Sequence, residues 1–369
     1  MRIMFIISSL GGGGAERVVS TLANGLAARG HQIAVVLTAR DNQDYPLSDQ
    51  VSLVKLDCGR RYQKMLAPIR VARRIFDIRK AIKENSADAV ISFVAETNID
   101  VCLASLGVRT PIIVSERNDP AAEPANPIKQ VLRKLAYWRA DGFVFQTPDA
   151  QSFFSRRIQR KSVIILNPMV PRFAEPYIGE REKRIVAVGR LHEQKNYPLL
   201  IGAFSKFSTL YPEYVLEVYG EGPLRADIET QIKSCGLDGK ALLKGFSKNV
   251  QEQIRTAAFF VMPSAFEGMP NALIEAMALG LPCISTDCRC GGPRMLIENE
   301  KNGILVPVND EEALRQAMTK LAERPVFAKA LGERARDINK RVDVQIVADQ
   351  WLKYIDRIIK KGRNNENQN

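Results

Sequence analysis

Residues 257–286 read AAFFVMPSAFEGMPNALIEAMALGLPCIST, and this stretch decides the fold class. The apolar run AAFFVM is followed by a Gly-Met-Pro-Asn turn, an apolar helical pattern over 271–279 and a second short apolar run over 282–286. Strand-length apolar runs on both sides of a helix are typical of parallel strands joined by a helical crossover. Ligands of such sheets bind beyond the carboxyl ends of the strands, which is where Glu267 and Glu275 flank the turn.

The same alternation of strand-like runs and helical patterns extends along the chain. Helical patterns cover, among others, 15–29, 70–84, 128–138, 196–210, 222–235 and 311–323. The strand-like runs form two series, one at 2–8, 33–38, 51–56, 89–94, 111–115, 142–146 and 163–166, the other at 184–189, 214–219, 241–245, 258–262, 282–286 and 304–306. Residues 167–184 interrupt the pattern with prolines. We therefore predict two doubly wound α/β domains, 1–170 and 184–344, joined by a linker over 171–183.

The composition limits the class of protein. The 369 residues are 46% hydrophobic and 25% charged, and no apolar run approaches the roughly 18 residues that span a bilayer. The first residues, MRIMFIISSL, resemble a buried strand more than a signal peptide. Six cysteines in a chain of this length do not suggest a disulfide framework, so we expect a cytoplasmic protein.

The net charge of +12 is concentrated in the first half of the chain, where residues 1–170 hold 24 Lys and Arg against 15 Asp and Glu. The densest basic run covers residues 60–85, and its apolar positions recur at helical spacing. A basic amphipathic helix suits an anionic membrane surface or a phosphate-bearing lipid. The alternative is a solvated helix that packs on its domain through isoleucines. Nucleic acid is disfavoured because few aromatic side chains accompany the charges.

Two loops of the first domain are candidate binding sites. GGGG at 11–14 lies between a strand and a helix, where glycines let the backbone approach a ligand closely. Glu16 stands where a dinucleotide-binding fingerprint needs its last glycine, which disfavours a hydride-transfer enzyme. The second loop, SERNDP at 115–120, places the polar residues Glu116, Arg117 and Asn118 at the end of an apolar strand.

Two loops of the second domain favour binding of a diphosphate. Arg190 and Lys195 follow the strand RIVAVG and precede a helix that Asn196 can cap. Two cations beside a helix amino terminus supply charge and backbone donors to an anion. In the opening stretch, Asn271 can cap the helix, and the backbone amides around it point at an anion. Glu267 and Glu275 cannot bind phosphate themselves, so we expect them to accept hydrogen bonds from hydroxyls on either side of it.

The combination of these motifs resembles retaining glycosyltransferase family 4. The residues that carry the resemblance are GRL and QKN within 189–196, EGMPNALIEA with its Glu-x7-Glu spacing, GGGGAERVV near the start and NGILVPVND near the end. The resemblance implies a GT-B fold, with two Rossmann-like domains facing across a cleft. It also implies that the last helix, within 345–369, crosses back to the first domain.

The resemblance implies roles for the candidate residues of both domains. The nucleotide-sugar would bind mainly the second domain, where Arg190 and Lys195 neutralise the departing diphosphate, Glu275 holds the ribose and Glu267 faces the donor sugar. Catalysis would then consist mostly of leaving-group stabilisation and positioning. The other residues implied in donor binding are Gly13, Gly14, Gly189, Gly245, Gly268, Met269, Pro270, Asn271 and Ala272.

The basic run at 60–85 indicates what kind of acceptor to expect. A polyprenyl-diphosphate-linked glycan at the cytoplasmic face of the membrane would meet Arg60, Arg61, Lys64, Arg70, Arg73 and Arg74, with Glu116 or Asn118 orienting its hydroxyl. The resemblance extends to bacterial enzymes that lengthen lipid-linked oligosaccharides. We favour transfer of an N-acetylhexosamine such as GalNAc from its UDP-sugar. The alternatives are a UDP-galactose or UDP-glucose transferase of capsule or O-antigen synthesis and an inactive nucleotide-sugar-binding protein.

No metal or other cofactor is expected. The sequence shows no Asp-x-Asp motif at a strand end, and the cysteines at 283, 288 and 290 lack the paired spacing of a zinc site. Many family members carry a histidine where this chain has SERND, but the only histidines here are His31 and His192. We therefore assign no catalytic histidine.

Overall fold

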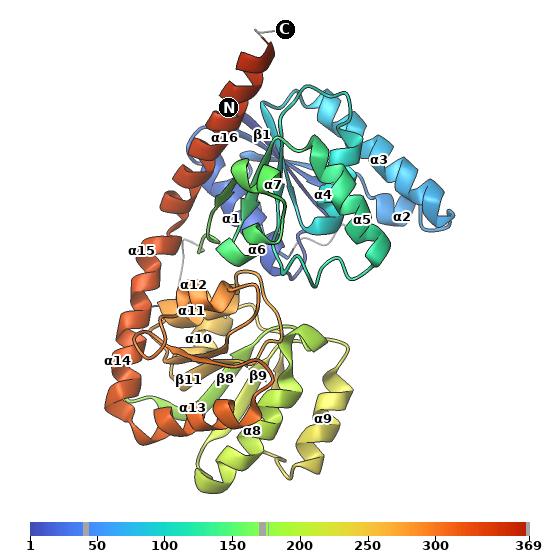
Figure 1. Cartoon of the computed structure of the whole chain (residues 1–369). Coiled ribbons are helices and arrows are strands. Elements are labelled where there is room, and N and C mark those ends of the chain that lie inside the picture. Colours follow the sequence, from blue (N-terminus) through green and yellow to red (C-terminus); the bar gives the residue numbers. More distant parts are fainter. Residues whose placement is uncertain (40–43, 170–174, 176, 367–369) are drawn as a thin grey trace. The chain divides into compact units, whose positions relative to one another are not determined.

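The computed structural model describes residues 1–39, 44–169, 175 and 177–366, with side chains described as far as residue 362. The chain divides into two compact units, Met1–Val170 with Val342–Asn369, and Pro171–Arg341 (Figure 1). Part of the predicted linker, residues 171–174 and 176, lies outside the described residues. Within the described ranges, no helix is both long and apolar enough to span a membrane.

The first unit is built on a seven-stranded parallel sheet in the order β3-β2-β1-β4-β5-β6-β7. Most of these strands are buried on both faces, as the continuous apolar sequence AVISF of β4 requires. The chain order reverses between β1 and β4, which are paired side by side. The strands are β1 (Arg2–Ile7), β2 (Gln32–Leu37), β3 (Val51–Lys55), β4 (Ala89–Phe93), β5 (Ile112–Ser115), β6 (Gly142–Phe145) and β7 (Ser162–Ile164).

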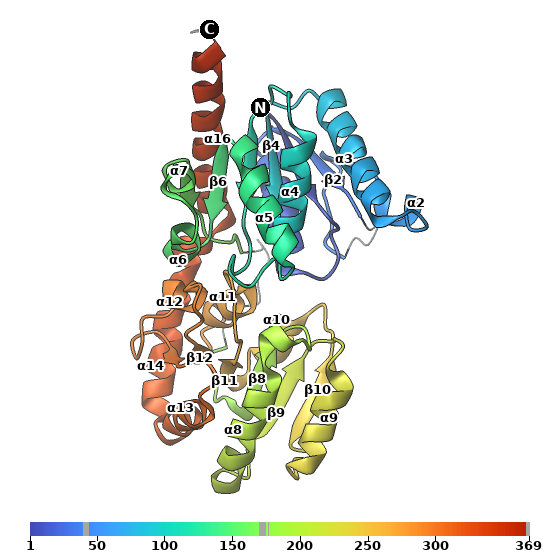
Figure 2. The same ribbon diagram turned by 45° about the vertical axis from the view of Figure 1, so that its right-hand side comes forward.

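Helices cover both faces of this sheet (Figure 2). On one face α3, α4 and α5 lie side by side, and on the other face α1 contacts the carboxyl-terminal helix α16. The helices are α1 (Gly14–Ala27), α2 (Cys58–Arg61), α3 (Ala67–Glu84), α4 (Ala95–Ala104), α5 (Pro127–Ala136) with the 3-10 turn η1 (Tyr137–Arg139), α6 (Pro148–Ser152), α7 (Arg156–Arg160) and α16 (Val344–Glu366).

The carboxyl-terminal helix α16 is part of the core of the first unit. Trp351 is fully buried, and its ring lies 5.9 Å from the ring of Phe93 on β4. The hydroxyl of Tyr354 accepts a hydrogen bond of 2.7 Å from the amide of Phe143 and donates to the carbonyl of Lys161. The last helix therefore completes the fold of the amino-terminal part of the chain.

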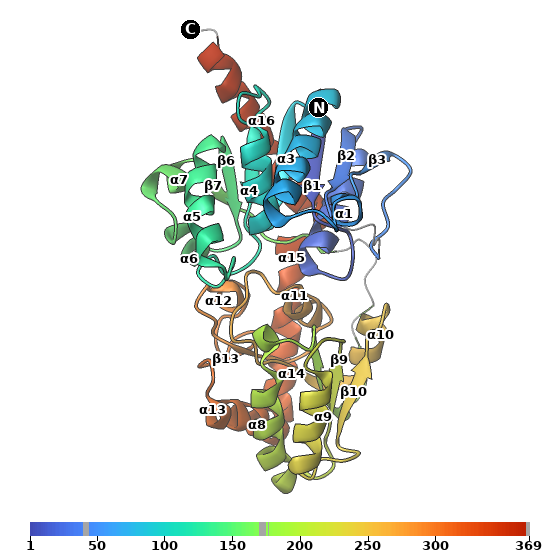
Figure 3. The same ribbon diagram turned by 90° about the vertical axis from the view of Figure 1, so that its right-hand side faces the viewer.

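The second unit repeats the plan with a six-stranded parallel sheet in the order β10-β9-β8-β11-β12-β13 (Figure 3). Its strands are β8 (Glu182–Val188), β9 (Val215–Tyr219), β10 (Ala241–Gly245), β11 (Ala257–Met262), β12 (Cys283–Thr286) and β13 (Ile304–Val306). Its helices are η2 (Glu193–Lys195), α8 (Tyr197–Leu210), α9 (Arg225–Ser234), α10 (Val250–Ile254), α11 (Asn271–Ala278), α12 (Gly292–Leu296), α13 (Glu311–Glu323), α14 (Pro325–Ala335) and η3 (Arg336–Ile338), and the four-residue α15 (Asn339–Val342) leads out of it.

The prediction of two α/β units with parallel sheets is confirmed, and each predicted strand-like run overlaps a strand. The interpretation of 60–85 as one helix is wrong. The segment forms α2, a turn, and then α3, which begins at Ala67 with Pro68 in its first turn. Proline favours the first turn of a helix because it has no amide to donate, and it disfavours helical backbone in the residue before it. The break therefore lies where the sequence places that proline.

Candidate functional site

The candidate site of the second unit lies where the chain order of its sheet reverses. β8 and β11 are paired, and the chain leaves them in opposite directions across the sheet. Loops that follow two such strands are adjacent at the carboxyl edge, which is where ligands of open α/β sheets bind. One loop carries Gly189, Arg190 and Lys195, and the other carries Glu267.

An ion pair joins these two loops. Lys195 Nζ lies 2.5 Å from Glu267 Oε1, and both side chains are almost completely buried. Ser264 Oγ donates to the same carboxylate oxygen over 3.0 Å. Because both contacts use Oε1, Oε2 can accept a hydrogen bond from a ligand hydroxyl. Arg190, in contrast, has an exposed side chain that makes no ion pair within the described residues.

Several buried groups hold the two loops in place. The carbonyl of Gln194 accepts from the amide of Ala265 over 2.9 Å, and its side-chain amide donates to the carbonyl of Phe266 over 3.1 Å. Thr286 Oγ1 donates to the carbonyl of Ser264. Tyr197 lies beneath the site and donates to the carbonyl of Gly189 over 3.1 Å. Burial, and next the charge of Glu267, raise the pKa of Tyr197, so it remains a neutral donor.

Helix α11 carries the second glutamate into the same region. Glu275 is buried and accepts a hydrogen bond of 3.1 Å from the side-chain amide of Gln251 on α10. The predicted cap by Asn271 is wrong, because Pro270 occupies the capping position and Asn271 is the first helical residue. Asn196 does occupy the capping position of α8, but its side chain donates to Asn309 Oδ1 instead of accepting from the helix.

Close backbone contacts join the loops that contain the predicted glycines Gly189 and Gly245 at the carboxyl edge of the sheet. The amide of Gly189 donates to the carbonyl of Tyr219, and the amide of Gly220 donates to the carbonyl of Gly245. A Cβ on Gly220 would lie 1.9 Å from the carbonyl oxygen of Gly189, so this contact requires glycine. Sequence reasoning missed Gly220 and its neighbour Gly222. The signal was available, since YGEGP at 219–223 directly follows a strand.

The loop that contains Gly268, Met269 and Pro270 contacts the start of α12. A Cβ on Gly292 would lie 1.6 Å from the carbonyl oxygen of Gly268. Gly292 therefore fixes the distance between α12 and the turn that leads to Asn271 and Ala272.

Replacement of Gly292 by alanine is expected to displace this turn. A displacement of about 1 Å in a group that positions a substrate can lower the rate about 10²-fold, and we expect a loss of that size in the sugar transfer that the family resemblance implies. Steady-state transfer assays would measure the loss. Gly362→Ala on α16 is the control, because its Cβ would make only an ordinary contact, 3.8 Å from Pro111. Equal rates for Gly292→Ala and the wild type would exclude a positioning role for this contact.

The glycine-rich loop of the first unit also lies where chain order reverses, between β1 and β4. Gly13 is the residue before α1, Gly14 is its first residue, and the Glu16 side chain lies directly over Gly13. Val94, at the end of β4, has a φ of +72°. A β-branched residue in that conformation stores about 1–3 kcal/mol of strain, which is typical of functional loops. No pattern in the sequence predicted this feature.

The SERNDP loop follows β5, and its glutamate faces the interior. Glu116 is buried and accepts a hydrogen bond from the hydroxyl of Tyr137. Burial raises the pKa of Glu116, and the charge of Arg133 offsets part of that effect. Asn118 Oδ1 accepts from the amide of Asp119, which orders the loop. The structure thus places the Glu116 side chain against Tyr137 inside the first unit, and its contact with an acceptor hydroxyl stays a prediction.

Arg117, in the same loop, is an unusual buried cation. Its guanidinium lies 4.8 Å from the ring centre of Phe93 and 5.6 Å from that of Trp351, and Nη1 donates to Asn167 Oδ1 over 2.9 Å. Burial lowers the pKa of Arg117 to about 9. No carboxylate pairs with it within the described residues. Arg117 thus connects the end of β5 to α16 through aromatic rings.

Of the six basic residues predicted to contact the acceptor, two form ion pairs within the first unit and four do not. Arg61 pairs with Asp77 at 3.3 Å, and Arg74 pairs with Asp100 on α4 at 2.7 Å. The remaining four are exposed or half-buried and make no ion pair within the described part of the chain: Arg60, Lys64, Arg70 and Arg73. The apolar positions of α3 divide in the same way. Ile78 and Ile82 are buried, whereas Leu66 and Ile69, at its amino-terminal end, are exposed.

The cysteines and histidines form no metal site in the described residues. No group of three or more His, Cys, Asp or Glu side chains there is arranged to hold a metal ion. Cys283, Cys288 and Cys290 are buried and form no disulfide, and burial raises the pKa of Cys288 to about 12. His31 lies 3.4 Å from the amino terminus, and His192 caps η2.

Comparisons with known proteins assign the chain to a family. The model for glycosyl transferases group 1 matches residues 172–338, and the model for the glycosyl transferase 4-like domain matches residues 13–168. Two similar proteins come from Campylobacter jejuni. One, 29% identical over 96% of this chain and 98% of its own, is named GalNAc-alpha-(1->4)-GalNAc-alpha-(1->3)-diNAcBac-PP-undecaprenol alpha-1,4-N-acetyl-D-galactosaminyltransferase. The other, 26% identical over 96% and 99%, is named N-acetylgalactosamine-N,N'-diacetylbacillosaminyl-diphospho-undecaprenol 4-alpha-N-acetylgalactosaminyltransferase.

Solved structures share the fold. Alr3699/HepE from Anabaena, crystallised with UDP, superposes with a TM-score of 0.81 at 17% identity over 97% of this chain and all of that one. Sucrose-phosphate synthase from Thermosynechococcus elongatus gives a TM-score of 0.83 at 18% identity over 98% and 99%. The resemblance predicted from the sequence motifs is thereby confirmed: the chain belongs to the glycosyltransferases of group 1 with a 4-like amino-terminal domain, and it has the GT-B fold.

Proposed function

We propose that the chain transfers a sugar from a UDP-sugar to a polyprenyl-diphosphate-linked glycan, with retention of the anomeric configuration. The observation that carries the proposal is the buried Lys195–Glu267 pair beside the exposed Arg190, at the chain reversal of the second sheet. Two cations there suit a diphosphate, and the free oxygen of Glu267 suits a sugar hydroxyl. Solved structures of the same fold that bind UDP support a UDP-linked donor.

The transfer step that we propose combines this arrangement with the same-face reaction that the family resemblance implies. The bond between the anomeric carbon and the β-phosphate oxygen breaks, and the acceptor hydroxyl forms the new bond on the same face of the sugar. The departing phosphate oxygen takes the proton of that hydroxyl, so UDP is the leaving group. Because that phosphate oxygen accepts the proton, no separate general base is needed, and Arg190 and Lys195 stabilise the negative charge that develops on the phosphate.

For donor and acceptor, we favour UDP-GalNAc and an undecaprenyl-type lipid-linked glycan. The names of the two Campylobacter relatives support GalNAc as the sugar and undecaprenyl diphosphate as the lipid. A relative from Escherichia coli supports the alternative, UDP-galactose. It is 31% identical over 47% of this chain and is named UDP-Gal:alpha-D-GlcNAc-diphosphoundecaprenol alpha-1,3-galactosyltransferase.

A donor screen with the purified chain tests the proposal. Radiolabelled UDP-GalNAc, UDP-galactose and UDP-glucose would each be incubated with a short-chain polyprenyl-diphosphate-linked glycan, and the anomeric configuration of the product read by NMR. We expect transfer from UDP-GalNAc with retention. Transfer only from a UDP-hexose would select the alternative donor. Binding of UDP without transfer from any donor would identify a nucleotide-sugar-binding protein and contradict the proposal.

We propose that the chain meets its acceptor at the inner face of the cell membrane. The amino-terminal half of α3 would contribute to holding the chain at that surface. Exposed cations and exposed apolar side chains alternate in this segment, as in helices that lie at an anionic bilayer surface. Because Arg74 is paired with Asp100, Arg70 and Arg73 are the α3 cations best placed to act.

Charge reversal at Arg70 and Arg73 is expected to impair use of the lipid-linked acceptor. Each basic residue near an anionic surface contributes about 1 kcal/mol, so we expect a loss of at least about tenfold in kcat/KM for that acceptor. A soluble acceptor glycan without lipid should be used at the wild-type rate. Lys233→Glu with Lys329→Glu, two exposed positions of the second unit, is the control. An equal loss on the soluble acceptor would remove the membrane argument.

A further inference from the structure

Helix α5 and the 3-10 turn η1 that continues it carry an apolar ridge that nothing in the described structure covers. Five side chains at helical spacing are largely exposed, from 41% at Leu132 to 71% at Ile128. Exposed apolar groups that gather on one helix mark an interaction surface, whereas single ones need no explanation. We call this surface the α5 ridge, and its members are Ile128, Val131, Leu132, Leu135 and Trp138.

The opposite side of α5 is firmly attached to the first unit. Arg133 is 1% exposed, and its guanidinium lies 5.2 Å from the ring centres of both Phe153 and Phe154. It donates to the carbonyls of Glu123 over 2.7 Å and Pro120 over 2.8 Å. The ridge is therefore presented outward by an ordered helix.

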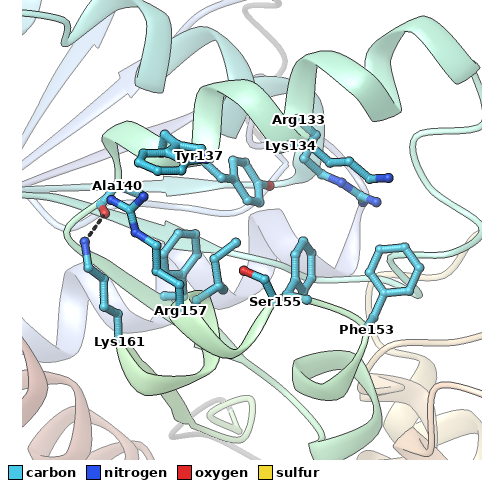
Figure 4. A pocket seen from close by; sticks show the side chains of 12 residues that line it. Arg133, Lys134, Tyr137, Ala140, Phe153, Ser155, Arg157 and Lys161 are labelled. Carbon is cyan, nitrogen blue, oxygen red and sulfur yellow. Dashed lines mark hydrogen bonds between the residues drawn. The ribbon is translucent and has the colours of Figure 1, made fainter.

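A pocket of about 270 Å³ opens beside the ridge, between the end of α5 and α7 (Figure 4). Aromatic side chains, among them Tyr137, line its interior, and Lys134, Arg157 and Lys161 line its edge. Arg157 stacks on Trp138, with its Cζ 3.6 Å from the ring centre. Burial lowers the pKa of Lys161, and none of these three cations makes an ion pair within the described residues. The edge of the pocket therefore carries unbalanced positive charge.

The charge of residues 127–161 indicates what kind of partner binds the α5 ridge. Residues 127–161 hold eight Lys and Arg against two Asp, and α5 itself has no acidic residue. A symmetric contact between two copies of this chain would bring the same basic surface against itself. An anionic bilayer surface complements it, since apolar side chains can enter the interface while cations meet lipid phosphates.

We infer that the α5 ridge and its basic pocket dock this chain on anionic phospholipid bilayers. The inference rests on the proposed function in one respect only: the bilayer on which the chain docks would be the one that carries the lipid-linked acceptor. The ridge enters the interfacial region with Trp138 at the level of the headgroups, a position that tryptophan favours. Lys134 and Arg157 bind the lipid phosphates, and this contact adds to that of α3.

Tryptophan fluorescence provides a direct test. The chain has two tryptophans, and Trp351 is fully buried in the core, so only Trp138 can report insertion. We expect vesicles that contain phosphatidylglycerol to shift the emission to shorter wavelength, and brominated lipids to quench it. Trp138→Phe should abolish both signals. An unchanged spectrum with saturating vesicles would overturn the inference.

Vesicle co-sedimentation of the full chain tests the ridge itself. Val131→Glu with Leu135→Glu is expected to lower the partition coefficient on phosphatidylglycerol vesicles about 30-fold, because two apolar side chains no longer enter the interface. Leu210→Glu with Val326→Glu, equally exposed positions of the second unit, should bind as the wild type does. Pure phosphatidylcholine vesicles should bind all variants weakly.

Two outcomes would overturn the inference. One is wild-type binding of anionic vesicles by the Val131→Glu, Leu135→Glu variant. The other is a wild-type dimer that this variant splits into monomers with unchanged vesicle binding, since the ridge would then be a dimer interface. Failure of the proposed transfer reaction is distinguishable, because it appears in the donor screen with the short-chain polyprenyl-diphosphate-linked glycan, where no vesicles are present.

Discussion

Glu267→Gln is expected to lower the turnover number for sugar transfer about 10²- to 10³-fold, the usual cost of removing one polar group that stabilises a transition state. In the structure Glu267 accepts from Lys195 and Ser264 through one oxygen, and we propose that its other oxygen holds the donor sugar. The glutamine keeps the shape of the side chain but removes the charge that fixes Lys195. Affinity for UDP, which lacks the donor sugar, should stay within about threefold, because the lost contact acts on transfer.

The control for this experiment is Glu193→Gln, an exposed glutamate in η2, two residues before Lys195. It should transfer at the wild-type rate. Thermal unfolding of both variants would show whether the substitution weakens the fold, since loss of one member of a buried ion pair can destabilise a protein. Wild-type turnover in a folded Glu267→Gln variant would show that the reaction centre lies elsewhere.

Arg190→Ala is expected to weaken binding of UDP about 10- to 100-fold, the range for charge-assisted hydrogen bonds worth about 1.5–3 kcal/mol. Arg190 is exposed and makes no ion pair within the described residues, so its loss should not disturb the fold. UMP lacks the second phosphate, so its affinity should change less. Isothermal titration with both nucleotides measures the difference.

The informative comparison is with Lys195→Gln. Lys195 is held by Glu267 at 2.5 Å, so a diphosphate has to share it with that carboxylate. Its removal should therefore affect UDP affinity less than turnover, and its effect should not add to that of Glu267→Gln, because contacting residues act as a unit. The surface control is Lys183→Ala at the start of β8. Equal loss of UMP and UDP affinity in Arg190→Ala would contradict contact with the second phosphate.

The sequence predicted the fold well because its apolar runs match the period and length of buried parallel strands. AVISF at 89–93 and CIST at 283–286 are examples, and both are fully buried on two faces. The helical pattern over 60–85 failed because periodicity does not register the break that Pro68 introduces. Local backbone preference overrode the pattern at that point.

The candidate site was predictable where it depends on loops that follow strands. Arg190, Lys195 and Glu267 were selected as candidates because each lies just beyond an apolar run, and the structure pairs Lys195 with Glu267. Their mutual arrangement was not predictable, because an ion pair between residues 72 apart depends on which strands are neighbours. The sequence also did not show which polar side chains are buried. Nothing in the neighbouring residues distinguishes Glu116, which contacts Tyr137 in the interior, from an exposed loop glutamate. The strain at Val94 and the aromatic contacts of Arg117 likewise arise only from tertiary packing.

A crystal structure of the chain with bound UDP tests the central claim most directly, namely that Arg190 and Lys195 bind the diphosphate between the loops after β8 and β11. We predict phosphate oxygens at hydrogen-bonding distance, about 3 Å, from the side-chain nitrogens of both residues, with a ribose hydroxyl on Glu275. A UDP molecule whose diphosphate contacts neither side chain would contradict the account.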